Sequence, residues 1–401
     1  MSTTGSTRGM PPSLRALDVL LSRMPAGSLT LSWPGGERRY EGTQPGPDAH
    51  VHMRSGSAAR RIITRGGTGL AEGYMNQDWD TPDLKAVLDL GMENLAITDL
   101  GNRVPTIAAP VQRLWHRLRD NNLTGSKRNI EYHYDLGNDF YELWLDDTMT
   151  YSAAMFQEPD ACGSESLTAA QHRKWNALLE RLEPSRGDHL LEIGCGWGGF
   201  AMHAAREAGC RVTGVTLSQE QHDWAVKRIA EEGLDGLIEI RLQDYRVIPE
   251  RFDGIASIEM FEAVGERWWP VFFARVRELL ADRGRAAIQT ITIAEETFEH
   301  YRSNPDFIQR YIFPGGMLPS PERFARAASD ADLKVDEPEF FGRCYAATLE
   351  KWLEQFEEVV PHVHELGFDE RFVRMWRYYL AYCRTGFRNG VIDVMQVSLE
   401  P

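Results

Sequence analysis

The segment Leu190–Gly199 constrains the fold of this chain more than any other part of its sequence. It reads Leu-Leu-Glu-Ile-Gly-Cys-Gly-Trp-Gly-Gly, an apolar strand followed by glycines at alternate positions, and predicts a helix that begins near Phe200. Glycines allow the backbone to turn tightly and to approach a ligand at the helix N-terminus, as in doubly wound α/β domains. The G-x-G-x-G spacing differs from the G-x-G-x-x-G of dinucleotide sites. The ligand-binding residues expected in this turn are Glu192, Gly194, Gly196 and Gly198.

Three further strands are expected after this turn, at residues 209–216, 238–245 and 252–258. In an open α/β sheet, ligands bind at the carboxyl ends of the strands. The first of these strands ends in hydroxyl and amide groups, and the next ends in a carboxylate and an aromatic ring that suit adenine. Together with the acidic Glu192, these groups favour a cationic cofactor, S-adenosylmethionine. The residues expected to contact it here are Thr216, Leu217, Gln221, Asp244 and Tyr245.

A series of motifs resembles, in the same order, those of the cyclopropane fatty acid synthase family of S-adenosylmethionine-dependent methyltransferases. They lie at residues 132–141, 150–152, 194–199, 214–216, 243–246, 261–262, 311–316 and 374–380. The resemblance runs from about residue 130 to the C-terminus. It implies a Rossmann-like class I methyltransferase domain that modifies the cis double bond of unsaturated acyl chains in membrane phospholipid. Tyr151 and Ser152 match a family pair that reaches the cofactor, whereas His133 and Asp135 either cover the cofactor or cap a helix.

The resemblance also implies that a bicarbonate ion removes a proton after methyl transfer. The family holds this ion with a Cys, a Glu, a His, a Tyr and a backbone group. Glu262 and Tyr345 match the Glu and the Tyr, but Ala153 stands at the Cys position and Gln289 at the His position. An amide donates a hydrogen bond to an anion but does not take up a proton. An additional acidic residue, Glu259, precedes the matching Glu.

These residues leave two alternatives for the base that removes the proton. Either bicarbonate is held by Glu262, Gln289 and Tyr345, or Glu262 is itself the base, with a pKa raised by burial. Cys383 lies where family members carry a cysteine once considered catalytic, although this chemistry needs no thiol nucleophile. Because proton removal is altered, we expect a methyl-branched or methylated unsaturated chain in preference to a cyclopropane, both formed through a carbocation.

Two other functions remain open for this sequence. Amine N-methyltransferases share the catalytic fold and motifs, although the basic N-terminal region argues against a small amine as substrate. The changes at Ala153 and Gln289 are also compatible with a protein that binds the cofactor without turning it over.

The chain of 401 residues is long enough for more than one domain. We expect an N-terminal α+β domain at 1–105 that engages lipid and a basic helical linker at 106–129. A methyltransferase domain at 130–401 follows, with a mostly helical insertion at about 294–388 for the acyl chain. In the first domain the sequence predicts helices at 14–21, near 62 and at 82–90, strands at 29–33 and 49–53, and turns at 34–36 and 44–47. The last strand of the chain is expected at 391–399.

The distribution of charge indicates a lipid surface as partner. The net charge of −15 argues against nucleic acid, but basic residues concentrate before residue 70 and at 111–128. In the second region Val111, Leu114, Trp115 and Leu118 form one apolar helical face among arginines. Such a helix either lies on an anionic membrane or packs on its own protein.

The sequence also bears on localisation. No apolar run approaches the roughly 18 residues of a membrane span, and the five cysteines show neither a disulfide nor a zinc pattern. We therefore expect a cytoplasmic protein, without a metal site, that associates peripherally with the inner face of the membrane. A homodimer is compatible with this sequence, which says nothing about oligomeric state.

Overall fold

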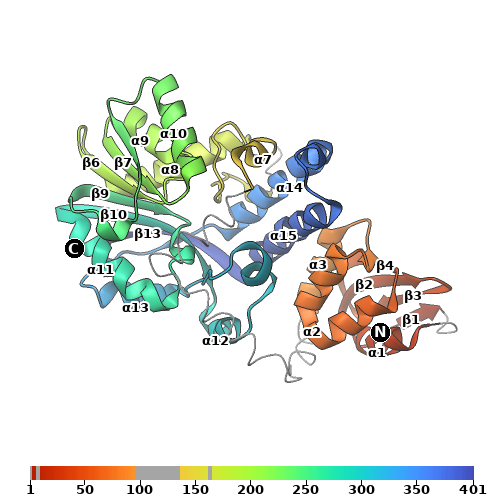
Figure 1. Cartoon of the computed structure of the whole chain (residues 1–401). Coiled ribbons are helices and arrows are strands. Elements are labelled where there is room, and N and C mark those ends of the chain that lie inside the picture. Colours follow the sequence, from red (N-terminus) through yellow and green to blue (C-terminus); the bar gives the residue numbers. More distant parts are fainter. Residues whose placement is uncertain (1, 6–9, 95–135, 161–164) are drawn as a thin grey trace. The chain divides into compact units, whose positions relative to one another are not determined.

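In a computed structural model the chain forms two compact units, each with its own sheet (Figure 1). The structure describes residues 2–5, 10–94, 136–160 and 165–401. One unit comprises Met1–Leu114, Pro305–Ile308 and Val360–Asn389; the other comprises Trp115–Asn304, Gln309–Val359 and Gly390–Pro401. The linker expected at 106–129, its basic helix at 111–128, and His133 and Asp135 lie outside the described residues.

The first unit contains a five-stranded sheet with the strand order β1-β3-β2-β4-β5. Its strands are β1 (Ser2–Gly5), β2 (Ala26–Trp33), β3 (Gly36–Glu41), β4 (Gln44–Met53) and β5 (Trp79–Asp80). The strands predicted at 29–33 and 49–53 are present within β2 and β4. The turn predicted at 44–47 is wrong, because these residues begin β4, where Gln44 pairs with Ala26. The chain turns instead at Gly42 and Thr43, whose backbone N–H groups donate to Gly27 and Pro25.

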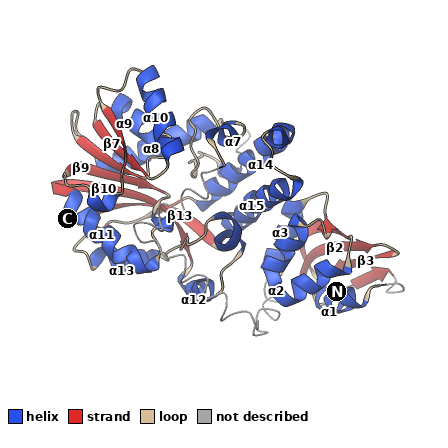
Figure 2. Ribbon diagram, viewed as in Figure 1, coloured by secondary structure: helices blue, strands red, loops and turns tan. Residues whose placement is uncertain are grey.

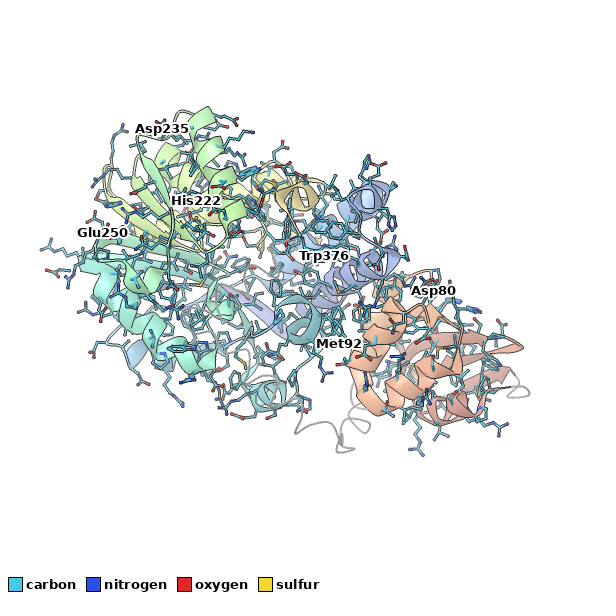
Figure 3. All side chains as sticks on the ribbon, in the orientation of Figure 1. Asp80, Met92, His222, Asp235, Glu250 and Trp376 are labelled. Carbon is cyan, nitrogen blue, oxygen red and sulfur yellow. The ribbon has the colours of Figure 1, made fainter. Side chains whose placement is uncertain are left out.

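Among its described residues this unit also contains the helices α1 (Pro12–Leu21), α2 (Gly56–Met75), α3 (Leu84–Glu93) and α15 (Glu370–Arg388), and the end of α14 (Gly342–Glu365) from residue 360. Buried arginines of α15 attach this helix to the N-terminal residues. The Arg374 guanidinium donates to the carbonyl oxygen of Tyr74 at 2.6 Å, and Arg384 pairs with Asp89 of α3 at 2.6 Å. Trp376, labelled in Figure 3, is buried on the same helix. The segment 360–389, expected within the methyltransferase insertion, is thus grouped by its packing with the N-terminal residues.

The second unit contains an eight-stranded sheet, and its core is parallel. The strands are β6 (His189–Ile193), β7 (Arg211–Thr216), β8 (Ile238–Leu242), β9 (Phe252–Ile258), β10 (Leu280–Ile293), β11 (Lys334–Val335), β12 (Glu339–Phe340) and β13 (Ile392–Glu400). Their order is β11-β13-β10-β9-β6-β7-β8, with β12 also paired to β13. Strands β6 to β10 pair in parallel, and β13 is antiparallel to β10. This is the doubly wound α/β sheet that the sequence predicts.

Helices cover both faces of this sheet (Figure 2). One face carries α8 (Leu167–Leu182), α9 (Gly199–Glu207) and α10 (Gln219–Glu231), and the other carries α11 (Trp269–Leu279) and α13 (Pro321–Ser329). Successive side chains of a strand point to opposite faces. Leu190 therefore packs with the first group of helices and Leu191 with the second, and both are buried. Burial of both faces explains why the consecutive residues Leu190 and Leu191 are both apolar.

Further elements of the second unit lie near the carboxyl ends of the parallel strands. They are α7 (Asn138–Glu142), α12 (Glu295–Ser303) and the part of α14 (Gly342–Glu365) that precedes residue 360. Residues 149–156, which lie between α7 and α8 in the sequence, form an irregular loop. Across the described ranges of the chain, no helix combines the length and apolar character needed to cross a membrane.

Candidate active site

The glycine-rich turn connects β6 to α9 through left-handed backbone conformations. Gly194 has a φ of 82°, and a Cβ at this position would lie 2.8 Å from the Cγ of Met260. Gly196 has a φ of 53°, and a Cβ there would meet nothing within 4 Å, because it would project into open space. Only glycine adopts these conformations without cost and leaves that space free for a ligand.

Gly194 and Gly196 line a pocket of about 170 Å³ at the carboxyl ends of β6, β7, β8 and β9. It is lined by most of the residues that the sequence singles out for cofactor binding: Tyr151, Ser152, Glu192, Gly194, Gly196, Thr216, Leu217, Gln221, Asp244 and Tyr245. Gly198 does not line it; this residue precedes α9 as its N-terminal cap, with a φ of 81°. The turn, the strand ends and the loop at 149–156 thus meet around one cavity.

Glu192 supplies a carboxyl group to the lining of this pocket. Its side chain is buried, and its Oε2 has no hydrogen-bond partner among the described residues. Burial raises the pKa of Glu192 well above the usual range of a glutamic acid. A buried carboxyl oxygen without a partner is unfavourable unless a ligand supplies one. The pocket therefore fits a cofactor that brings a positive charge or hydrogen-bond donors, as S-adenosylmethionine does.

The ends of β7 and β8 hold their polar groups in fixed positions. Thr216 donates to the side chain of Gln221 at 2.9 Å, and Ser218 caps α10 by accepting from the backbone N–H of Gln221. Asp244 forms an ion pair with Arg246 at 2.6 Å, and Tyr245 packs edge-on against Phe272. The carboxylate expected to bind the adenine amine is therefore already oriented by a neighbouring guanidinium.

A buried lysine, which sequence analysis missed, supports the loop beside the pocket. Lys174 of α8 is fully buried, and its Nζ donates to the Oγ of Ser152 at 2.8 Å. Burial lowers the pKa of Lys174 to about 7, while the carboxylates of Glu259, Asp146 and Glu192 oppose this shift. The signal in the sequence is weak, since Lys174 lies between Gln171 and Leu178 on the apolar face of an otherwise ordinary helix.

Two of the predicted catalytic residues, Gln289 and Tyr345, donate hydrogen bonds to the carboxylate of Glu259. Its Oε1 accepts from the backbone N–H of Ala153 at 2.8 Å and from the Nε2 of Gln289 at 2.7 Å. Its Oε2 accepts from the phenol of Tyr345 at 2.7 Å. Glu259 also lines the cofactor pocket beside Ser152. Sequence analysis identified Glu259 only as an additional acidic residue. In the structure its hydrogen bonds connect the loop at 149–156, β10 and α14.

The orientation of Gln289 follows from a chain of hydrogen bonds inside the sheet. A carboxylate only accepts, so the Gln289 amide must present its NH₂ group to Glu259. Its oxygen then accepts from the Nε2 of Gln396, on the neighbouring strand β13, at 3.0 Å. Gln396 also donates to the carbonyl oxygen of Lys174 at 3.3 Å. Gln289 and Gln396 are fully buried, and the role of Gln396 could not be read from the sequence.

Glu262 lies in a different environment from Glu259. It is part of a 3-10 turn at Phe261–Ala263, and its Oε1 accepts from the backbone N–H of Ile291. Its Oε2 is buried and has no hydrogen-bond partner among the described residues. Burial, together with the nearby charge of Glu259, raises the pKa of Glu262 to about 8. Glu262 is therefore mostly protonated at neutral pH. Gln289 and Tyr345 donate hydrogen bonds to Glu259, and neither donates to Glu262.

Cys383 belongs to the first unit, where it lies on α15. Burial and the nearby carboxylate of Asp306 raise the pKa of its thiol. A thiol with a raised pKa is a poor nucleophile at neutral pH.

Comparisons with known proteins relate this site to a family. The family model described as mycolic acid cyclopropane synthetase matches residues 121–397. The chain is 39% identical over 369 residues to the tuberculostearic acid methyltransferase UfaA1 of Mycobacterium tuberculosis, which covers 88% of this chain and 83% of that relative. It is 34% identical over 358 residues to the cyclopropane-fatty-acyl-phospholipid synthase of Escherichia coli, which covers 87% of each chain.

A solved structure has the same fold over much of the chain. The crystal structure of the mycolic acid cyclopropane synthase CmaA1, complexed with SAH and CTAB, superposes with a TM-score of 0.64 at 32% sequence identity. The superposition covers 69% of this chain and 98% of CmaA1.

Proposed function

Because the chain belongs to the mycolic acid cyclopropane synthetase family, we propose that it transfers a methyl group from S-adenosylmethionine to the double bond of unsaturated fatty acyl chains. The observation that carries this proposal is the shared pocket. One cavity is lined both by the glycine-rich turn with Glu192 and by the hydrogen-bonded carboxylate of Glu259. The cofactor site therefore adjoins a carboxylate, Glu259, that can accept a proton or stabilise a positive charge on the substrate.

The residues of the pocket suit the two halves of the cofactor. Glu192 offers an unpartnered oxygen for a cationic or hydrogen-bonding group, and Gly196 leaves room above the turn. Asp244 and Tyr245 stand at the end of β8 for the adenine amine and ring. When it is bound, S-adenosylmethionine supplies an electrophilic methyl group on a sulfonium centre. Residues of this chain orient the alkene against that methyl group and exclude water.

Aromatic side chains beside the pocket are suited to stabilise a carbocation on the substrate. The ring of Tyr151 lines the pocket and lies 5.3 Å from that of Trp352, which in turn lies 6.2 Å from the ring of Tyr345. Trp144 packs edge-on against Tyr151 and Trp352. Aromatic faces attract cations without being readily alkylated, and a buried carboxylate adds Coulomb attraction. This cluster thus favours C-methylation of an alkene.

The proposed product is a methylated chain that is not a ring. The support is that Ala153 and Gln289 replace the Cys and His of the bicarbonate site, and that the relative with 39% identity is named a tuberculostearic acid methyltransferase. The proposed substrate is an acyl chain of membrane phospholipid, reached from the membrane surface. The support is the E. coli relative, named for a fatty-acyl phospholipid.

The test is mass analysis of fatty acids from a host that is rich in monounsaturated phospholipid and expresses this protein. A chain heavier by one CH₂ that keeps a double bond is the expected result. A heavier chain with a ring would support alkene methylation but contradict the non-ring product. If no heavier chain forms, and purified protein transfers no labelled methyl to phospholipid vesicles, the proposed function is wrong. Free amines assayed in parallel would then identify an amine methyltransferase.

A further inference from the structure

The donors that the family uses for bicarbonate are occupied in this chain by one of its own side chains. We infer that the carboxylate of Glu259 is the built-in base that removes the proton after methyl transfer, in place of a bicarbonate ion. The role of Glu259 as a base rests on the proposed function. Its occupancy of the bicarbonate position does not.

The geometry around Glu259 carries the inference. The backbone N–H of Ala153, the amide of Gln289 and the phenol of Tyr345 donate to it at 2.8, 2.7 and 2.7 Å. By the resemblance, these positions match the Cys, the His and the Tyr that hold bicarbonate in the family. A carboxylate and a bicarbonate ion present the same pair of acceptor oxygens, so one set of donors serves one of them at a time. The residues present therefore do not fit a bicarbonate ion beside Glu259.

The backbone at Glu259 shows that this placement has a cost. Glu259 directly follows β9 and has a φ of 50°, in the left-handed region that disfavours residues with a Cβ. Its backbone N–H donates to the carbonyl oxygen of Gln289 at 2.8 Å, which holds this conformation. Glycine would adopt the same conformation freely. A strained residue that lines a ligand pocket indicates a function for its side chain.

The two neighbouring carboxyl groups differ in how easily they ionise. Glu259 accepts three hydrogen bonds and is further favoured in its charged form by the Lys174 ammonium, although burial still raises its pKa. Glu262 accepts from a backbone N–H and has one unpartnered oxygen, and its pKa rises to about 8. Because two like charges disfavour each other, Glu259 ionises first and Glu262 remains a neutral acid near pH 7. An ionised group is required to accept the proton.

The proton-transfer step balances without any further reactant. The π electrons of the alkene form the new carbon–carbon bond to the methyl group, and the carbon–sulfur bond breaks with its electron pair left on sulfur. The resulting cation on the chain loses a proton to an oxygen of Glu259. The electron pair of that carbon–hydrogen bond closes a double bond or a cyclopropane ring. Three of about four acceptor positions of the carboxylate are filled by donors, which leaves one for the substrate proton.

The test compares variants at Glu259 with a matched control elsewhere. Glu259→Gly removes the carboxylate and relieves the backbone, whereas Glu259→Gln keeps the shape without the charge. Glu183→Gly is the control, because Glu183 also has a left-handed φ, of 47°, and its carboxylate pairs with Arg285 away from the pocket lining. In the presence of S-adenosylhomocysteine, carbon-13 NMR of labelled bicarbonate should show binding to Glu259→Gly only. The wild type and Glu183→Gly should bind none.

Turnover provides the second measurement. In buffer freed of carbon dioxide, the wild type and Glu183→Gly should keep full methyl transfer, while Glu259→Gln and Glu259→Gly lose about 100-fold or more. Added bicarbonate or formate should restore Glu259→Gly but not Glu259→Gln. The inference is wrong if the wild type binds or requires bicarbonate, if Glu259→Gln stays active, or if neither anion rescues Glu259→Gly. If the wild type methylates no lipid, the proposed function fails, and the NMR measurement still decides whether Glu259 occupies the anion site.

Discussion

The substitution Gly196→Ala separates the two reasons for a glycine in the turn after β6. Gly196 lines the pocket and has a φ of 53°, and a Cβ there would meet no atom of the protein within 4 Å. The left-handed backbone then costs an alanine about 1 kcal/mol of folding free energy. The new methyl group also takes up space at a residue that lines the cofactor pocket. Overfilling a close-packed site typically costs about 1–3 kcal/mol, so cofactor affinity should fall about 5- to 150-fold.

Gly233 offers a matched control for this prediction. It follows α10 in an exposed turn with a φ of 67°, and a Cβ there would also meet nothing within 4 Å. Urea unfolding should show similar losses of stability for Gly196→Ala and Gly233→Ala. Calorimetric titration with S-adenosylhomocysteine should show weaker binding for Gly196→Ala alone. Equal affinity for the two variants would refute the argument that the cofactor lies against this turn.

Three further predictions concern the buried network. Tyr345→Phe and Lys174→Met each remove a group that favours the ionised form of Glu259, so the acid limb of the activity–pH profile should move to higher pH; an unchanged profile would contradict this. Glu262→Gln removes a group whose folded pKa is raised to about 8, so the wild type should lose stability relative to the variant as pH rises from about 4.5 to 8. The slope is at most about 1.4 kcal/mol per pH unit, and urea midpoints that track each other across that range would argue against a buried neutral acid. Gln396→Met leaves the side-chain oxygen of Gln289 without its hydrogen-bond donor and should cost about 1–3 kcal/mol in stability, measured by urea unfolding. Turnover should be slower, but the affinity for the cofactor should not change. Weaker binding of S-adenosylhomocysteine would contradict a role of Gln396 that is confined to Gln289.

The local parts of the site could be predicted from the sequence because neighbouring residues determine them. A few consecutive residues are enough to predict strand β6, the glycine-rich turn and the polar ends of β7 and β8. Since parallel strands bring their carboxyl ends to one edge of a sheet, these segments had to meet around one pocket. The resemblance to a family then supplied the positions of Tyr345 and Gln289, which lie far from the turn in sequence.

Other features of the sequence misled or gave no signal. The glycine and proline residues at 44–47 suggested a turn, but pairing with β2 draws them into β4. Strand β3 was not expected, because only Tyr40 in it is deeply buried and its other residues are largely polar. Lys174 and Gln396 look unremarkable in the sequence, since a buried polar residue is recognised only through its partners. Those partners belong to other segments of the chain.

The sequence by itself determined the doubly wound fold, the cofactor turn and the class of chemistry, because each depends on short-range pattern. Only the tertiary structure decided which carboxyl group can act as the base. Glu259 and Glu262 are three residues apart and equally acidic as isolated side chains. The folded chain places Ala153, Gln289 and Tyr345 around the first and leaves the second with an unpartnered oxygen. Hydrogen bonding and burial, which exist only after folding, set which of the two is charged.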